Sequence, residues 1–288
     1  MPEESRPLVS IIIPCYNAAP WVAEAIETCL NQTYQPIEII VVDDGSTDNS
    51  LSIIHSFGDR IKWVSGPNHG GCHARNRGFG LSRGKYVMFL DADDKIAPEN
   101  VALLVQALDG KLDHMAACEW RYLSKQGNRW KEFKPLRLPR HLDDIQRELY
   151  GAHTPLGAWL QPRDIVTRIG GWDEALTAYQ DVDFRLRCLL SGAKFIRIRG
   201  GRFYYRLHEF PSVSKTVSES ALRSRLRVLE KTQETMRQKG VLDFYRFALA
   251  KAYQDLASSA ASIAPSLANH CLLSTKQLSN GTPIDRGQ

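Results

Sequence analysis

Three carboxylates stand within four positions of one another, directly behind an apolar run, in the stretch VMFLDADDKI at residues 87–96. Asp91, Asp93 and Asp94 repel one another at this spacing, which costs free energy unless a cation lies among them. Successive side chains of an extended chain point to opposite faces, so Asp91 and Asp93 are expected on the same side. Paired oxygen ligands at a strand end suit Mg²⁺ or Mn²⁺, which also bind phosphate oxygens.

A second acidic turn follows another apolar run, in IEIIVVDDGSTDNS at residues 37–50. Acidic turns are common, and Ser46 or Thr47 could simply cap the next helix. That interpretation leaves Asp44 unexplained, because a further carboxylate facing the same crevice adds to the repulsion. A nucleobase edge with N–H groups, such as uracil or guanine, would give Asp44 a hydrogen-bond donor.

Alternating strand and helix patterns over the first hundred residues position these turns. Apolar, often β-branched runs predict strands at 9–14, 37–42, 61–64 and 86–90. Helical spacing and capping signals predict helices at 21–30, 48–57, 71–82 and one opened by Pro98. The alternation predicts a mainly parallel sheet flanked by helices, in which ligands bind beyond the carboxyl ends of the strands. The acidic turns and PCYN at residues 14–17 stand at those ends.

The rest of the chain has weaker signals. The basic, aromatic stretch RWKEFKPLRLPRHL at 129–142 reads as a loop, and a helix ended by Gly192 is expected to follow residue 184. Two helices are then expected at 218–239, with Gly240 as C-cap, and at 242–263. Residues 215–251 hold nine bases and four acids, a balance that equals the net charge of +5. We expect an ordinary solvated helix face there, with attraction to anionic lipid as the alternative.

The composition is that of an ordinary soluble protein, with 288 residues and 43% hydrophobic content. No apolar run approaches the roughly 20 residues that cross a bilayer, and the N-terminal MPEESRPLVS does not resemble a secretory signal. Six cysteines without Cys-x-x-Cys spacing indicate reduced thiols, and we interpret Cys15 as a packing residue. A cytoplasmic location is expected, with peripheral attachment at the inner membrane face as the alternative. Nucleic-acid binding is not expected, because the positive excess lies outside the acidic crevice.

Four segments resemble family 2 glycosyltransferases in order and spacing, over roughly residues 7–210. They are PLVSIIIPCYN, IEIIVVDDGSTDNS, GPNHGGCHARNRGFGLSRGKYVMFLDADD and GGWDEALTAYQDVDFRLRC. The resemblance implies an α/β GT-A fold, that of the nucleotide-diphospho-sugar transferases, for residues 1–210. A C-terminal helical extension at 211–270 and a flexible tail at 271–288 would follow. The resemblance is specific for the family and unspecific for the substrate.

The family's functional residues can be carried over to matching positions. The nucleotide would contact Pro14, Tyr16, Asn17, Asp44, Arg75 and Asp91. Asp93 and His208 would hold Mg²⁺ or Mn²⁺, and Asp181 matches the catalytic base. Gly171, Trp172 and Gln180 would lie near the donor sugar or the acceptor. Alternatives stay open for three of these residues: Asp181 could cap a helix with Asp183 as its exposed neighbour, His208 could be a solvated loop residue, and Trp172 could be core.

The resemblance implies sugar transfer from a nucleotide-sugar, with UDP expected, to a saccharide, lipid-linked or other acceptor hydroxyl, as in polysaccharide biosynthesis. One base opposite the leaving group gives single displacement with inversion. The family often has Glu-Asp where this chain has Gln180–Asp181, which could alter acceptor or donor contacts. The Gln-x-x-Arg-Trp motif of processive synthases is absent after Asp181, which favours one addition per event.

Other functions were weighed against this one. Sugar nucleotidyltransferases also pair aspartates with Mg²⁺, but residues 14–20 (PCYNAAP) contain neither the glycine nor the lysine of their phosphate loop. A NAD-dependent oxidoreductase would need Gly-x-Gly-x-x-Gly in the same place. A non-catalytic nucleotide-sugar-binding or regulatory protein remains an alternative, which would bind the donor without turnover.

Overall fold

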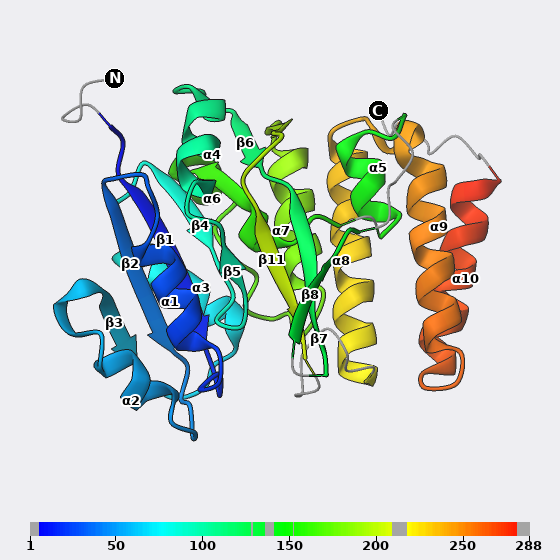
Figure 1. Cartoon of the computed structure of the whole chain (residues 1–288). Coiled ribbons are helices and arrows are strands. Elements are labelled where there is room, and N and C mark those ends of the chain that lie inside the picture. The colour runs from blue at the N-terminus through cyan, green and yellow to red at the C-terminus, as the bar shows by residue number, and fades with distance from the viewer. Residues whose placement is uncertain (1–5, 128, 136–140, 152, 209–217, 281–288) are drawn as a thin grey trace. The chain divides into compact units, whose positions relative to one another are not determined.

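The structure is a computed structural model that describes residues 6–127, 129–135, 141–151, 153–208 and 218–280. Its contacts divide the chain into two compact units (Figure 1). The first unit comprises residues 1–137, 154–174 and 191–209. The second comprises residues 138–153, 175–190 and 210–288. Residues 138–153 and 175–190, which the sequence placed in the GT-A domain, therefore group with the C-terminal helices.

A seven-stranded sheet forms the centre of the first unit, in the order β10-β6-β9-β4-β1-β2-β3. Its strands are β1 (Val9–Cys15), β2 (Ile37–Asp43), β3 (Lys62–Ser65), β4 (Tyr86–Phe89), β6 (His114–Ala117), β9 (Trp159–Pro162) and β10 (Lys194–Arg197). All pairings are parallel except those of β9, which runs antiparallel to both neighbours. The predicted mainly parallel sheet is thus confirmed, because its buried β-branched runs give a clear signal.

Helices flank this sheet close to the predicted positions. They are α1 (Val22–Leu30), α2 (Ser50–His55), α3 (Gly71–Leu81), α4 (Asn100–Leu108) and α6 (Arg163–Arg168), with short 3-10 turns η2 (Gly58–Arg60) and η3 (Leu156–Ala158). The helix expected to open at Pro98 begins two residues later, with Glu99 at its N-cap. The carboxyl ends of β1, β2 and β4 therefore lie along one edge of the sheet, where the polar turns begin.

A second, four-stranded sheet in the order β5-β11-β7-β8 corrects one prediction. Its strands are β5 (Lys95–Ile96), β7 (Trp120–Gln126), β8 (Arg129–Phe133) and β11 (Phe203–Leu207). The loop predicted at 129–142 is wrong for residues 129–133, which form β8 antiparallel to β7. All five residues of β8 are exposed, so no alternation of buried and exposed side chains marks the strand in the sequence. Residues 136–140 lie outside the described residues.

The second unit is helical. It contains α5 (Asp144–Leu149), α7 (Gln180–Leu190), α8 (Glu219–Gln238), α9 (Leu242–Ala260) and α10 (Pro265–Ser279). Leu229, Met236 and Leu249 belong to its buried core. The predicted helices are confirmed, and Gly240 follows α8 with φ +68°. Within the described part of the chain, no helix is both long and apolar enough to span a membrane.

Helix α10 differs from the flexible tail expected at residues 271–288. It continues to Ser279, because Cys271 and Leu278 are buried in the helical core. Residues 281–288 lie outside the described residues.

Several basic residues of the second unit are paired with carboxylates. Arg223 pairs with Glu219, Lys231 with Asp183, Arg237 with Glu234 and Lys251 with Asp255. Local pairing of this kind is typical of an ordinary helix surface, in agreement with the first interpretation of residues 215–251.

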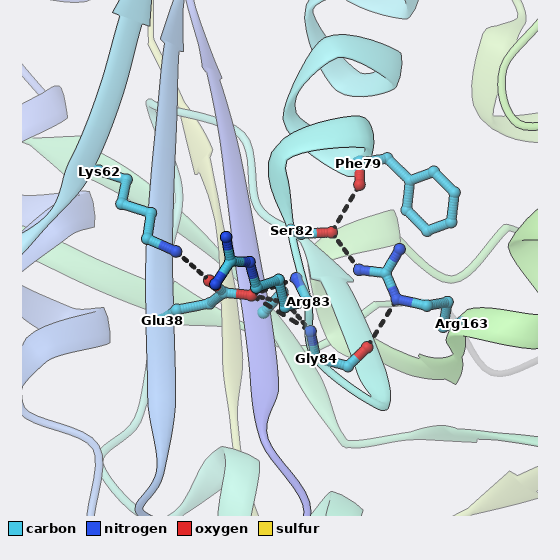
Figure 2. Close-up of polar contacts among 8 residues, drawn as sticks. Glu38, Lys62, Phe79, Ser82, Arg83, Gly84 and Arg163 are labelled. Carbon is cyan, nitrogen blue, oxygen red and sulfur yellow. Dashed lines mark hydrogen bonds and ion pairs between the residues drawn. The ribbon is translucent and has the colours of Figure 1, made fainter.

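The turn between α3 and β4 is anchored on Glu38 of β2 (Figure 2). The Glu38 carboxylate accepts hydrogen bonds from Lys62 Nζ at 2.7 Å, from the Arg83 amide at 2.6 Å and from the Gly84 amide at 3.2 Å. Ser10 Oγ of β1 also donates to it, at 2.6 Å. Burial raises the pKa of Glu38, but these donors outweigh burial and the net pKa is lowered.

Arg163 of α6 holds the same turn from the other side. Its Nε donates to the Gly84 carbonyl at 2.8 Å, its second nitrogen reaches Ser82 Oγ, and its guanidinium lies over the Phe79 ring (Figure 2). Because α3 carries Arg75 and β4 leads to Asp91, this anchor fixes the two elements that support the polar edge of the sheet.

Candidate active site

The loops that follow β1 and β2 are joined by Asn17. Its side-chain oxygen accepts from the backbone amides of Thr47 at 2.8 Å and Asp48 at 3.3 Å. Its backbone amide donates to Ser46 Oγ at 3.0 Å. Asn17 has φ +49°, a conformation that asparagine tolerates better than most residues. The residue predicted to line the nucleotide therefore also shapes the loop around it. The neighbouring Tyr16 ring is 52% exposed, available to a ligand, and Pro14 is half-buried in β1.

Asp44 is buried and holds a third loop. Its two carboxylate oxygens accept from the amides of His69 at 2.9 Å and Gly70 at 2.8 Å, directly before α3. Each oxygen of an ionised carboxylate has a further lone pair, so these bonds leave capacity for a nucleobase N–H. Asp44 thus has a structural role that the sequence did not indicate, beside the predicted contact with the nucleotide.

The cysteine in this region is inert. Cys15 is buried, and burial raises the pKa of its thiol to about 12, so the thiol stays protonated. All six cysteines fall among the described residues; each is buried and none forms a disulfide. The predicted packing role of Cys15 is confirmed.

Asp91 is paired with Arg75 at the end of β4. Arg75 is buried and donates to Asp91 Oδ1 at 2.6 Å, while its guanidinium lies 4.7 Å from the centre of the Trp172 ring. Trp172 is only 3% exposed and packs edge-on against Phe89. The core interpretation of Trp172 therefore fits the structure, because Arg75 and Phe89 cover the ring that would stack on a sugar.

Asn76 anchors the loop that contains Gly171. Its side-chain oxygen accepts from the Trp172 amide at 2.8 Å, and its nitrogen donates to the Trp172 carbonyl at 3.0 Å and to Glu174 Oε1 at 2.7 Å. Gly171 has φ +72°, and a Cβ at this position would lie 2.6 Å from Asn76 Oδ1. Only glycine fits so close to Asn76, a residue that the sequence analysis did not single out.

His208 contacts Asp93. Its Nε2 lies 2.9 Å from Asp93 Oδ2, and its ring stacks on Trp21 with centroids 5.8 Å apart. The alternative of a solvated loop histidine is wrong, because the His208 side chain is only 9% exposed. Burial raises the pKa of Asp93, and repulsion from Asp91 adds to the rise, while the bond with His208 opposes it.

Asp94 completes the acidic cluster and is buried. Its Oδ1 accepts from the Arg206 amide at 2.8 Å. Burial raises the pKa of Asp94 well above its ordinary value, and repulsion from Asp93 and Asp91 adds to that shift. The three carboxylates of VMFLDADDKI thus have three different partners. Only Asp93 is paired with a side chain, His208, that could itself bind a metal ion.

The donor set fits a divalent ion that is shared with a ligand. Asp93 Oδ2 and His208 Nε2 offer one oxygen and one nitrogen at 2.9 Å from each other. Within the described residues, no group of three or more His, Cys, Asp or Glu side chains could hold a metal ion. Two protein ligands suit Mg²⁺ or Mn²⁺, because such ions commonly complete their coordination with phosphate oxygens and water.

Asp181 belongs to the second unit, in the first turn of α7. Its side chain is 41% exposed, with Arg185 Nη1 at 3.8 Å from one carboxylate oxygen. Arg185 is buried and donates to Glu148 Oε2 at 2.8 Å. The predicted base is therefore an accessible carboxylate beside a fixed guanidinium, while Gln180 donates locally to the Leu176 carbonyl at 2.9 Å.

The structure reverses the expected exposure of Asp183. As the neighbour of a capping Asp181 it is expected to be exposed, but Asp183 is buried and pairs with Arg187 at 2.6 Å and Lys231 at 2.9 Å. The two cations compensate the buried charge of Asp183, so its acidic side chain is explained without a catalytic role.

Comparison with known proteins defines the class. The mixed α/β architecture, with a central sheet flanked by helices, is that of the GT-A fold. It resembles TarS 1–349 of S. aureus in complex with UDP-GlcNAc, with a TM-score of 0.65, 16% identity, and coverage of 94% of this chain and 88% of that one. Residues 10–170 match the family described as Glycosyl transferase family 2, and the chain belongs to that family.

Relatives with similar sequences are also named glycosyltransferases. An uncharacterized glycosyltransferase of Haemophilus influenzae is 46% identical over 101 residues, which cover 34% of this chain and 40% of the relative. Glycosyltransferase GlyG of Streptococcus pneumoniae is 36% identical over 126 residues, or 42% of each chain. An uncharacterized glycosyltransferase of Methanocaldococcus jannaschii is 28% identical over 212 residues, 71% of this chain and 72% of the relative. The matched segment spans less than half of the first two relatives.

Proposed function

We propose that this chain transfers one sugar per event from a nucleotide-diphospho-sugar to an acceptor hydroxyl, with inversion and with the help of Mg²⁺ or Mn²⁺. The observation that carries the proposal is the Asp93–His208 pair, at 2.9 Å, beyond the carboxyl end of β4. Membership of glycosyl transferase family 2 supports nucleotide-sugar transfer.

The first unit binds the donor in this proposal. Tyr16, Asn17 and Asp44 surround the base and ribose, on loops that are already joined by hydrogen bonds from backbone amides to side-chain oxygens. Arg75 fixes the direction of the Asp91 carboxylate through its 2.6 Å bond, and Asp91 contacts the ribose in this proposal. Asp93 and His208 would hold the divalent ion, which when bound stabilises negative charge on the departing diphosphate as a Lewis acid.

Asp181 is the general base in this proposal. The exposed Asp181 carboxylate accepts the proton of the acceptor hydroxyl as its oxygen attacks the anomeric carbon. The bond from that carbon to the diphosphate oxygen breaks in the same step, and the nucleoside diphosphate leaves with the electron pair. A single displacement from the opposite face inverts the anomeric configuration.

A UDP-sugar is the first donor to test. The chain shares its fold with TarS, whose structure was determined with UDP-GlcNAc. We therefore propose a UDP-sugar as the donor, with GDP- and dTDP-sugars as the comparison set. The acceptor is proposed as a saccharide, a lipid-linked saccharide or another hydroxyl compound.

A thermal-shift screen tests this function. UDP-, GDP- and dTDP-sugars are each added to the full chain with Mn²⁺ or with EDTA. One nucleotide class should raise Tm in Mn²⁺, because a ligand that binds only the folded state stabilises it by mass action. Asp93→Ala should lose the Mn²⁺-dependent part of that rise. If no nucleotide-sugar changes Tm under either condition, the proposed function is rejected.

A further inference from the structure

Arg206 of β11 contacts the acidic turn at both Asp93 and Asp94, although it is not one of the proposed metal or nucleotide ligands. It is a buried arginine whose guanidinium packs against two indole rings, 4.5 Å from the centre of Trp21 and 4.9 Å from that of Trp130. The two rings themselves meet edge to face at 5.8 Å. A planar guanidinium packed into the corner formed by two perpendicular aromatic rings has little rotational freedom, so its hydrogen bonds are fixed in direction.

These hydrogen bonds lead to the backbone of the acidic turn. Arg206 Nε donates to the Asp93 carbonyl at 2.7 Å, and the Arg206 amide donates to Asp94 Oδ1 at 2.8 Å. A terminal nitrogen of the same guanidinium pairs with Glu24 of α1. One residue therefore connects the acidic turn to α1 and to β11.

The second proposed metal ligand directly follows the same strand. His208 follows two positions after Arg206, and strand alternation directs such residues to the same side, away from Leu207 between them. The His208 ring stacks on Trp21, which also contacts the Arg206 guanidinium. The distance between Asp93 and His208 therefore depends on how Arg206 and Trp21 hold β11 against the acidic turn.

Trp130 reaches this cluster from the strand that the sequence did not reveal. In the four-stranded sheet Arg206 lies opposite Leu123 of β7, and Lys125 lies opposite Trp130 of β8. Alternation places Arg206 and Trp130 on one face of the sheet, and Trp130 remains 36% exposed. Through Trp130, the exposed strand β8 therefore contributes one of the two rings that pack against the Arg206 guanidinium.

We infer that Arg206 is a positioning residue for the Asp93–His208 pair, held in place by Trp21 and Trp130. The inference rests on the metal-assisted function proposed above. It adds Arg206, Trp21 and Trp130 to the residues on which metal binding depends. In this inference Arg206 acts through the Asp93 backbone and through β11, the strand that leads directly to His208.

A purely structural ion pair is the competing explanation. Glu24 has a second cation, because Lys95 Nζ lies 2.9 Å from its other oxygen, so loss of Arg206 would not leave Glu24 unpaired. A structural role predicts that Arg206→Lys lowers Tm and leaves metal affinity unchanged. Lysine keeps the charge but offers neither the fork that spans Asp93 and Glu24 nor the flat surface that packs against the two indoles.

Metal binding separates the two explanations without an activity assay. Mn²⁺ is titrated into the full chain with UDP present, and free Mn²⁺ is followed by EPR; UDP binding is measured separately in EDTA. Arg206→Lys should weaken Mn²⁺ binding by about 10- to 100-fold, the range typical for loss of a residue that orients metal ligands. UDP binding in EDTA should stay unchanged.

Two matched controls and a second variant make the test decisive. Arg60 also lies over an aromatic ring, Phe57, and donates to that residue's carbonyl, so Arg60→Lys is the control for a similar arginine away from the site. Should Arg206→Lys not fold, Trp130→Ala removes one of the two rings that pack against the Arg206 guanidinium. This variant should also weaken Mn²⁺ binding. Trp63→Ala, at a similarly exposed tryptophan of β3, is its control.

Each outcome has one meaning. Weaker Mn²⁺ binding in Arg206→Lys or Trp130→Ala, with both controls like the wild type, supports the inference. Wild-type Mn²⁺ affinity in a folded Arg206→Lys, or in Trp130→Ala where only that variant folds, overturns it and leaves the proposed function intact. Failure of the wild-type chain to bind Mn²⁺ with UDP would contradict the metal-assisted function, and the inference with it.

Discussion

His208 Nε2 and Asp93 Oδ2 lie 2.9 Å apart although 115 positions separate the two residues in the chain. The contact joins the turn after β4 to the end of β11, and so joins the two sheets of the first unit. It brings an imidazole to a carboxylate whose pKa is raised by burial and by the nearby Asp91. The central proposal, a divalent ion held at this pair, depends on that geometry.

Replacement of the proposed base should abolish transfer and spare donor binding. Asp181→Asn keeps the size of the side chain but cannot accept the proton of the acceptor hydroxyl. We expect kcat to fall by about 100- to 10,000-fold with little change in donor KM. Initial rates of UDP release with an acceptor measure this, and Asp255→Asn, at a carboxylate of α9 paired with Lys251, is the control. A kcat within about twofold of the wild type would remove Asp181 from the mechanism.

Two adjacent glycines allow a matched test of the Asn76 anchor. Gly170 and Gly171 have φ of +74° and +72°, but a Cβ at Gly170 meets nothing within 4 Å, whereas one at Gly171 meets Asn76 Oδ1 at 2.6 Å. Gly170→Ala should lower the free energy of unfolding by about 1–2 kcal/mol through backbone strain. Gly171→Ala should cost roughly 1–3 kcal/mol more through the clash. Urea unfolding measures both, and equal losses would show that the close approach to Asn76 does not matter.

The Glu38 anchor should make stability depend on pH. The folded-state pKa of Glu38 lies below its ordinary value of 4.5, so its contribution is full above pH 4.5 and is lost as the pH falls toward the lower folded-state pKa. Glu38→Gln should cost about 1–3 kcal/mol at neutral pH, because two amides, Ser10 and Lys62 lose a charged acceptor. The difference from the wild type should shrink as the pH is lowered below 4.5.

Urea unfolding of the wild type and of Glu38→Gln, at neutral and at acidic pH, measures how the contribution of Glu38 to stability changes with pH. Glu27→Gln, at an exposed position of α1, serves as the control and should show no such pH dependence. A Glu38→Gln penalty that stays constant from neutral pH to well below 4.5 would contradict the charged anchor.

Asp44 should have both a structural and a ligand-binding effect. Asp44→Asn replaces one acceptor oxygen by a donor, which leaves the amide of His69 or Gly70 without its partner. We expect a loss of about 1–3 kcal/mol in the free energy of unfolding. UDP affinity, measured by calorimetry, should fall as well. The exposed Asp59→Asn is the control, and unchanged unfolding and UDP binding in Asp44→Asn would refute both roles.

The sequence predicts the parallel core well for a physical reason. Strands β1, β2 and β4 are buried β-branched or apolar runs, and the turns behind them carry the polar residues that such sheets place at one edge. Local pattern and topology together are enough to bring these turns to the same edge. Residues 129–133 and 271–279 escaped prediction because β8 is exposed throughout and α10 has only a weak amphipathic pattern.

The supporting contacts of the site could not be predicted in the same way. Asn76 bonds to Trp172 across 96 positions, and Arg206 bonds to Asp93 across 113. No periodicity links such positions, since the contacts arise only when α3 and β11 are packed in three dimensions. The motif residues identify where the chemistry is expected, and the residues that hold them in place emerge from the structure.

The most direct test of the central claim is the metal dependence of turnover at Asp93. The release of UDP from a UDP-sugar, to an acceptor or to water, is measured for the wild type and Asp93→Ala as Mn²⁺ is restored after EDTA treatment. We predict that EDTA abolishes wild-type turnover, that Mn²⁺ restores it, and that folded Asp93→Ala stays inactive at every Mn²⁺ concentration. Undiminished turnover in EDTA, or in Asp93→Ala, would contradict the account.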